Sequence, residues 1–399
     1  MKIMDKTLLS TETCIEIEDD IWFMTDRYNI LFKMNKSTEK VEYVCAFNEE
    51  KFERFRLYRK IVLCQDRIVC IPYNARKIGI VDVNTYEIRY VNVKDEDQSE
   101  KYWGVCVYHE YIFMFGLGRK EILRLNVNNM AVDSLDAVTG SIPESIVKGT
   151  EHWFGNTVCL VRDMIYCTIN NSNIILALNA QTLEANWHMV GLDTDSYSGM
   201  LADEEGIWLL KSNAAGLLYW NINNHELKEY SEFSKCDSSG FFDYVEMILL
   251  NDHLYIFPCL GRHIIKLDIN SEQIQILSNL DTKLEDGNEK ASSHQRIHVS
   301  HAFISGAKIY IFSYINCTWI IYDTKTKDIR MLPLLLPQSE QLSLLQHTID
   351  RGIGNICEGI ISLDKFLDFI SLNEEKDIQT LASENGSNIY EKICSAINI

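Results

Sequence analysis

The chain has 399 residues, of which 46% are hydrophobic and 11% aromatic, enough for a large core or a long array of repeats. Its 57 acidic residues outnumber 38 basic ones, and the resulting net charge of −19 repels the phosphate backbone of nucleic acids. We therefore expect no nucleic acid partner, and five prolines with no low-complexity tract exclude a disordered chain.

The N-terminal segment and the cysteines predict a cytoplasmic protein. Residues 1–20 lack a continuous apolar core and turn acidic where the cleavage site of a signal peptide would stand. No run of 18 or more apolar residues occurs, so we expect no membrane span. The twelve cysteines include no C-x-x-C pair, and most lie in apolar strand patterns, where a free thiol acts as a small hydrophobe. Such a set of thiols is typical of a reducing compartment.

A strand–turn–strand pattern recurs along the chain, and its clearest copy is Lys77–Val93. Two apolar strand patterns flank a turn at Asn84 and Thr85, where Asp82 and Asn84 favour local hydrogen bonds. The seven copies are LFKMN at 31–35, VDVN at 81–84, LNVN at 125–128, LNAQ at 178–181, WNIN at 220–223, LDIN at 267–270 and YDTK at 322–325. Aligned on residues 33, 82, 126, 179, 221, 268 and 323, they recur every 42 to 55 residues. This period predicts propeller blades.

Each copy supports four strands. In the second copy these strands cover residues 57–64, 68–73, 77–83 and 87–93. The second strand carries an apolar-aromatic run, as in Ile21–Phe23 and Tyr255–Phe257, which is typical of strands covered on both faces by neighbouring blades. We predict an all-β fold, a seven-bladed β-propeller with four-stranded blades over residues 1–335. Met1–Ser10 could add an outer strand to the last blade.

The repeat ends at residue 336. Helical spacing follows at Gln341–His347 and Leu363–Leu372, and Asn388–Ile397 is predicted as a terminal helix after a polar break. We predict that residues 336–399 form a mainly helical C-terminal tail, which packs on the ring or offers an amphipathic face to a partner.

Two features resemble known propellers. The D-I-W-F pattern at Asp20–Phe23, with corners of the V-D-V-N-T kind, resembles the seven-bladed kelch, quinoprotein-like and streptogramin-lyase-like groups over residues 13–335. The resemblance lies in the form of the repeat, because the WD40 signature and the paired glycines of kelch blades are missing. The segment G-S-N-I-Y-E-K-I at 386–393 is similar to the ends of uncharacterised Firmicute propeller proteins, some associated with surface-glycan loci. The resemblance implies the fold and names no activity.

The segments that lead into the innermost strands are expected to converge near the central axis on one face, the funnel face. Trp and Tyr beside Arg and His suit stacking on sugars or anchoring a peptide. The residues predicted to bind a ligand are Arg56, Trp103, Trp153, Tyr197, Phe241, Asp243, Arg296 and His298. The alternative is that Trp103, Trp153 and Phe241 pack between blades, which is the commoner role of large aromatic residues.

Signatures of catalysis are weak. His294, His298 and His301 form a close cluster, but in a strand residues 298 and 301 point to opposite faces, which disfavours chelation. A streptogramin-lyase-like enzyme needs His and Glu converging on a divalent metal, and this chain offers His298, His301 and Asp243. The G-x-S-x-G, P-loop and H-E-x-x-H motifs are absent from the sequence. We expect no catalytic residue, no metal site and no cofactor.

These features favour a non-catalytic cytoplasmic propeller that binds a protein or glycan-related partner through its funnel face. The alternative is a lyase or hydrolase acting on a polysaccharide or cyclic substrate, with or without a divalent metal. A third interpretation places the function in the 336–399 tail and makes the ring a scaffold.

Overall fold

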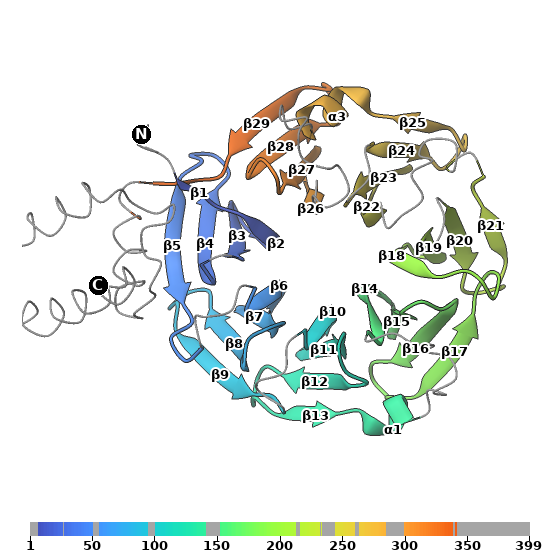
Figure 1. The fold of residues 1–399 in the computed structure, drawn as a ribbon, viewed down its shortest axis with the longest axis horizontal. Coiled ribbons are helices and arrows are strands. Elements are labelled where there is room, and N and C mark those ends of the chain that lie inside the picture. The colour runs from blue at the N-terminus through green and yellow to red at the C-terminus, as the bar shows by residue number, and fades with distance from the viewer. Residues whose placement is uncertain are drawn as a thin grey trace, which may run out of the picture.

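The structure is a computed structural model that describes residues 7–26, 28–50, 56–94, 100–140, 152–212, 216–231, 233, 244–259, 263–284, 299–337 and 340. These residues form a ring of seven four-stranded antiparallel sheets around a central axis (Figure 1). Within each sheet, the strands pair in chain order from the axis outwards. The predicted all-β, seven-bladed propeller with four-stranded blades is confirmed.

The strands occupy equivalent places in blades 1 to 7. The innermost strands are β2 (Thr11–Ile17), β6 (Tyr58–Cys64), β10 (Tyr102–Tyr108), β14 (Phe154–Val161), β18 (Tyr197–Ala202), β22 (Tyr244–Leu250) and β26 (Val299–Ser305). The second strands are β3 (Asp20–Thr25), β7 (Arg67–Pro72), β11 (Tyr111–Gly116), β15 (Met164–Ile169), β19 (Gly206–Lys211), β23 (His253–Pro258) and β27 (Lys308–Ser313).

The outer half of each blade follows the same order. The third strands are β4 (Ile30–Asn35), β8 (Lys77–Asp82), β12 (Ile122–Asn126), β16 (Ile174–Asn179), β20 (Leu217–Asn221), β24 (Ile265–Asp268) and β28 (Thr318–Asp323). The outermost strands are β5 (Val41–Ala46), β9 (Ile88–Asn92), β13 (Val132–Ser134), β17 (Ala185–Met189), β21 (Leu227–Glu229), β25 (Ile274–Ile276) and β29 (Ile329–Pro333). The short helices α1 (Asp136–Gly140) and α3 (Ser278–Leu284) follow blades 3 and 6.

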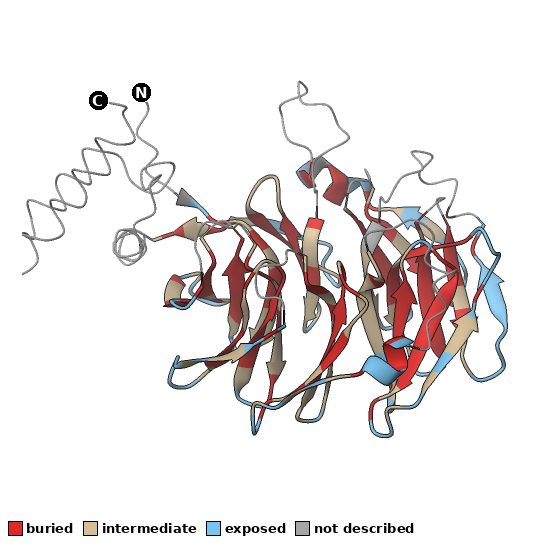
Figure 2. Cartoon of the chain, turned by 60° about the horizontal axis from the view of Figure 1, so that its bottom comes forward, coloured by how far each residue is buried: buried red, intermediate tan, exposed pale blue. Residues whose placement is uncertain are grey.

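Burial falls from the middle of most blades to their outer edge; blade 1 differs, because four of the six residues of β5 are buried. In β3, β7 and β11 the last five residues are all buried, whereas every residue of β21 is exposed (Figure 2). Large aromatic side chains such as Trp208 and Trp319 are fully buried in the apolar clusters that join neighbouring blades. Neighbouring blades therefore cover both faces of the second strands, as their continuous apolar runs predict.

A side-chain oxygen at the end of the third strand closes the corner of each blade. Asp82 Oδ1 accepts hydrogen bonds from the main-chain N–H groups of Asn84 and Thr85, both at 2.9 Å. The residues that accept such bonds at the other corners are Asn35, Asn126, Asn179, Asn221, Asp268 and Asp323. In the first copy the corner residue is Asn35, so the sequence alignment on residue 33 was wrong by two positions there.

The ring closes through a two-residue ladder outside the blades. The strand β1 (Thr7–Leu8) pairs antiparallel with β30 (Leu335–Leu336), which follows the outermost strand of blade 7. The next residue, Leu9, donates its N–H to Leu334 O at 2.9 Å and buries its side chain in the cluster between blades 1 and 7. The sequence suggested that Met1–Ser10 could add an outer strand to the last blade. The structure instead pairs β1 with β30, outside the four-stranded sheet of that blade.

The predicted helical tail lies outside the described residues, apart from its first few positions. Within the described ranges, no helix is long and apolar enough to cross a membrane.

Candidate functional site

Every innermost strand carries a register irregularity near its first residue. In blade 3, Tyr102 pairs with Gly116 and Gly104 pairs with Phe115, so Trp103 is an unpaired bulge residue. The equivalent unpaired residues in blades 1, 2, 5, 6 and 7 are Glu12, Arg59, Ser198, Val245 and Ser300, while blade 4 leaves three residues, 155–157, unpaired. We call these positions the bulge ring. A bulge redirects the side chain that it leaves outside the ladder.

A cavity of about 420 Å³ lies where the innermost strands of all seven blades meet. Five consecutive blades line it with residues of the bulge ring, which are Ser300 of blade 7, Glu12 of blade 1, Arg59 of blade 2, Trp103 of blade 3, and Asn156 and Thr157 of blade 4. Further along the same strands, the wall is also lined by Cys14, Ile61, Val105, Val158, Met200 and Met247. The wall therefore changes from polar at the bulge ring to largely apolar further along the strands.

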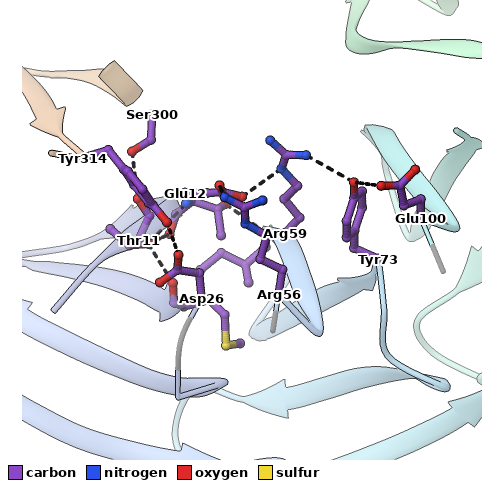
Figure 3. Close-up of polar contacts among 12 residues, drawn as sticks. Thr11, Glu12, Asp26, Arg56, Arg59, Tyr73, Glu100, Ser300 and Tyr314 are labelled. Atoms are coloured by element: carbon purple, nitrogen blue, oxygen red, sulfur yellow. Dashed lines mark hydrogen bonds and ion pairs between the residues drawn. The ribbon is translucent and has the colours of Figure 1, made fainter. Parts of the chain in front are cut away.

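Arg59 is held by two aromatic rings and a carboxylate. Its guanidinium carbon lies 3.9 Å from the centre of the Trp103 ring and 5.2 Å from that of Tyr73. Its Nε lies 2.8 Å from Glu12 Oε2, and its Nη1 donates to the Tyr73 hydroxyl at 3.4 Å (Figure 3). Aromatic faces attract a guanidinium most strongly where water is displaced, so Trp103 and Glu12 together fix the orientation of the charged group.

Glu12 joins two arginines inside this site. Arg56 Nη2 lies 2.8 Å from Glu12 Oε1, opposite the contact with Arg59, and the Glu12 side chain is only 6% exposed. Burial raises the pKa of the Glu12 carboxyl, although Arg59 and Arg56 both act in the other direction. The positive charges of Arg56 and Arg59 therefore stabilise the ionised form of Glu12, which burial alone destabilises.

The surrounding hydrogen bonds connect the site to blades 7 and 3. Arg56 donates its main-chain N–H to Asp26 O at 2.9 Å, and the Asp26 carboxylate accepts a hydrogen bond from the Tyr314 hydroxyl of blade 7. On the other side, Tyr73 donates to Glu100 Oε1 at 3.0 Å (Figure 3). Arg56 has a positive φ of 55°, a conformation that non-glycine residues rarely adopt and that these contacts hold in place.

Two basic residues, Arg59 and Lys60, and two acidic ones, Glu12 and Glu246, lie in the described wall of the cavity, so the site lacks the acidic excess of the chain as a whole. Lys60 follows Arg59 in β6, and its Nζ donates to Asn156 O of blade 4 at 2.7 Å. Burial lowers the pKa of Lys60, an effect that Glu246 opposes. His301 also lies in the wall, and Arg56 and Asp26 stand next to Glu12 outside it.

The predicted ligand-binding residues have different placements. Trp103 lines the cavity and Arg56 pairs with Glu12 at its edge. Trp153 packs against the cluster between blades 3 and 4, with Lys120 Nζ 5.1 Å from its ring centre. Tyr197 is 3% exposed between blades 4 and 5 and donates its hydroxyl to Val190 O at 2.6 Å. The remaining four, Phe241, Asp243, Arg296 and His298, lie outside the described residues.

Sequence reasoning missed Glu12 and Arg59, the two residues that organise the site. A signal was present for Arg59, because four innermost strands begin with a tyrosine followed by the unpaired residue, whereas Thr11 precedes Glu12. These tyrosines are Tyr58, Tyr102, Tyr197 and Tyr244. Aligning the copies on this tyrosine, rather than on the corner, would have marked four positions of the bulge ring.

The histidine cluster considered as a metal site is only partly described. His301 lies in the cavity wall, whereas His298 and Asp243 are outside the described residues. Among the side chains that the structure describes, no group of three His, Cys, Asp or Glu residues is placed to hold a metal ion.

No protein-family model and no curated protein matches the chain. Among solved structures it is similar to virginiamycin B lyase from Staphylococcus aureus, with a TM-score of 0.57, 12% identity, and 79% of this chain and 94% of that chain covered. It is also similar to a streptogramin B lyase, with a TM-score of 0.56, 13% identity, and coverage of 79% and 93%. A third similar structure is Kuenenia stuttgartiensis hydrazine synthase, with a TM-score of 0.55, 10% identity, and coverage of 82% and 99%.

These identities are too low to transfer an activity, and the similarity shows the fold alone. It confirms the resemblance to streptogramin-lyase-like and quinoprotein-like propellers. The segment similar to Firmicute proteins lies outside the described residues.

Proposed function

We propose that the chain is a ligand-binding propeller, and that its bulge ring binds a carboxylate-bearing partner, either an acidic glycan or an acidic protein segment. The observation that carries the proposal is the Arg59 guanidinium, held 3.9 Å from the Trp103 ring centre at the wall of the central cavity. Cytoplasmic location and the absence of catalysis are parts of the same proposal.

A fixed guanidinium suits the recognition of a carboxylate. Arginine presents its donors in a planar fork that matches the two carboxylate oxygens, and a side chain already ordered has less conformational entropy to lose on binding. Because Arg59 covers one face of Trp103, the indole supports the guanidinium and that face is closed to a sugar ring. The acidic group of the ligand, rather than its sugar or peptide part, is therefore expected to provide the main contact.

The charge distribution supports the same class of partner. The chain carries a net charge of −19, yet Arg56, Arg59 and Lys60 gather at the cavity. The acidic remainder of the surface disfavours acidic ligands, whereas these basic side chains, offset in part by Glu12 and Glu246, favour them at this one place.

The test is a titration of the full chain with three probes: polygalacturonate oligosaccharides, a poly-glutamate peptide and uncharged dextran. We expect one acidic probe to bind, with an affinity that falls as salt rises, and dextran not to bind. Arg59→Met should weaken this binding by about 10- to 100-fold, which corresponds to the loss of a charge-assisted hydrogen bond. The matched control is Arg124→Met on the outer part of blade 3, where Arg124 pairs with the exposed Asp133. Equal binding of dextran and acidic probes, or unchanged binding by folded Arg59→Met, would refute the proposal.

A further inference from the structure

Part of the cavity wall consists of aliphatic side chains that are only half-buried. Beyond the bulge ring, the innermost strands of blades 1 to 5 each contribute such a side chain, and these are Ile15, Val62, Val105, Val158 and Leu201. We call these five positions the apolar belt. Each packs with part of its surface on an apolar cluster between blades, and the remainder is accessible. Accessible apolar surface gathered in one concave place is characteristic of a ligand site.

Polar side chains that follow the bulge ring in the wall already contact one another. Lys60 Nζ donates to Asn156 O at 2.7 Å, which joins blades 2 and 4. His301 Nδ1 lies 3.8 Å from Glu246 Oε2, which joins blades 7 and 6. A ligand that reaches beyond these groups therefore gains most by burying apolar surface against the apolar belt.

The apolar belt lies close to Arg59 along the same strands. Val62 follows Arg59 by three residues in β6, and Val105 follows Trp103, which supports the Arg59 guanidinium, by two residues in β10. Because a strand rises about 3.3 Å per residue, these positions are separated by roughly 7–10 Å along the strands. Neighbouring residues of one peptide can span this distance, so a single short segment can contact both Arg59 and the apolar belt.

We propose that the carboxylate-bearing partner is a peptide segment in which an acidic residue stands next to aliphatic residues. The acidic side chain binds Arg59, and an aliphatic side chain enters the cavity of about 420 Å³ and packs against the apolar belt. This inference rests on the proposed function and names which of its two classes of partner the cavity favours.

The chemistry of the wall separates the two classes of partner. An acidic glycan carries hydroxyl groups around each sugar ring, and those that face the apolar belt would lose water without gaining a hydrogen bond. A leucine side chain in the same place leaves water and gains contacts with Val105 and Val158, which line the cavity from neighbouring blades. The apolar belt therefore favours the peptide and disfavours the glycan, although Arg59 accepts a carboxylate from either.

The first experiment compares ligands of matched charge by calorimetric titration of the full chain. The probes are the peptides acetyl-Glu-Leu-Glu-Leu-amide and acetyl-Glu-Ser-Glu-Ser-amide, together with tetragalacturonate. We expect the leucine peptide to bind about 10- to 100-fold more tightly than the serine peptide, with a more negative heat-capacity change. Equal affinities of the two peptides, or tighter binding of tetragalacturonate than of the leucine peptide, would overturn this inference and leave the proposed function intact. Failure of all three probes to bind would refute both.

The second experiment places the apolar contact within the cavity. Val105→Thr keeps the shape of the side chain but adds a hydroxyl to the apolar belt, so the leucine peptide should bind about 3- to 10-fold more weakly and the serine peptide within about twofold of the unmodified chain. The matched control is Val107→Thr, because Val107 is half-buried in the same strand and apolar cluster but is not among the described residues that line the cavity. Arg59→Met should weaken both peptides alike. Unchanged binding of the leucine peptide by folded Val105→Thr, or an equal loss in Val107→Thr, would overturn the inference, whereas unchanged binding of both peptides by folded Arg59→Met would refute the proposed function.

Discussion

Replacing Leu9 with alanine should destabilise the ring at its closure. Leu9 is wholly buried between blades 1 and 7, where its cluster includes Phe312, Trp319 and Leu334. Alanine lacks three of its side-chain carbons, worth about 0.8 kcal/mol each, and the remaining cavity brings the usual cost of such a change to about 2–5 kcal/mol. The hydrogen bond from the Leu9 N–H to Leu334 O does not depend on the side chain, so the loss measures packing alone.

Differential scanning calorimetry at fixed pH and protein concentration gives the result directly. With an unfolding entropy of about 2.1 cal/mol/K per residue over a ring of this size, the expected fall in Tm is roughly 3–7 °C. Leu8→Ala is the matched control, because Leu8 stands in the same short strand and is 46% exposed, so its Tm should change by less than about 1 °C. Equal shifts for Leu8→Ala and Leu9→Ala, or no shift for Leu9→Ala, would show that packing at the closure does not limit stability.

Two further predictions concern carboxylates in the turns of the blades. The carboxylate of Asp203 accepts hydrogen bonds from Trp208 Nε1 at 3.0 Å and from the Tyr219 hydroxyl at 2.9 Å. In urea unfolding, Asp203→Ala should therefore lower the free energy of unfolding by about 1–3 kcal/mol. The control, Glu204→Ala at the exposed neighbouring position, should lower it by less than about 0.5 kcal/mol. Main-chain hydrogen bonds hold the pKa of Asp82, Asp268 and Asp323 below the usual range. The ionised carboxylates therefore stabilise the fold above the unfolded-state pKa of about 3.9, and this contribution is lost as pH falls through their pKa in the folded state. Changing all three to Asn, which keeps the accepting oxygen but cannot titrate, should flatten the fall of Tm between about pH 4 and 2; an unchanged acid limb would contradict this account.

The features that the sequence predicted correctly are local ones. The corner at Asp82 and the apolar runs of β3 and β23 are properties of a few adjacent residues, so each copy of the repeat could be recognised by itself. Repetition then defined the architecture, because seven such units bury their faces only by packing against one another. Even the error at Asn35 was a shift of two residues within a correctly recognised blade.

The candidate site could be predicted only in part, because it depends on strand register and on contacts between blades. Trp103 was noticed as an aromatic residue near the start of a strand, but nothing local shows that it falls outside the ladder and faces Arg59. Tyr197 has the same local context, yet its side chain packs between blades 4 and 5. Thr11 and Ser300 are separated by nearly the whole described ring in sequence, and only its closure brings them together, with Ser300 Oγ donating to Thr11 O at 2.7 Å.

The bulge ring allows each blade to be altered separately. Its residues form no ladder pair, so a substitution at Glu12, Arg59 or Trp103 changes the cavity without removing an inter-strand partner. Seven blades of one architecture thus offer a combinatorial set of recognition positions on a constant scaffold. A library randomised at these positions would vary specificity while the same framework is retained, which makes the ring a starting point for engineered receptors.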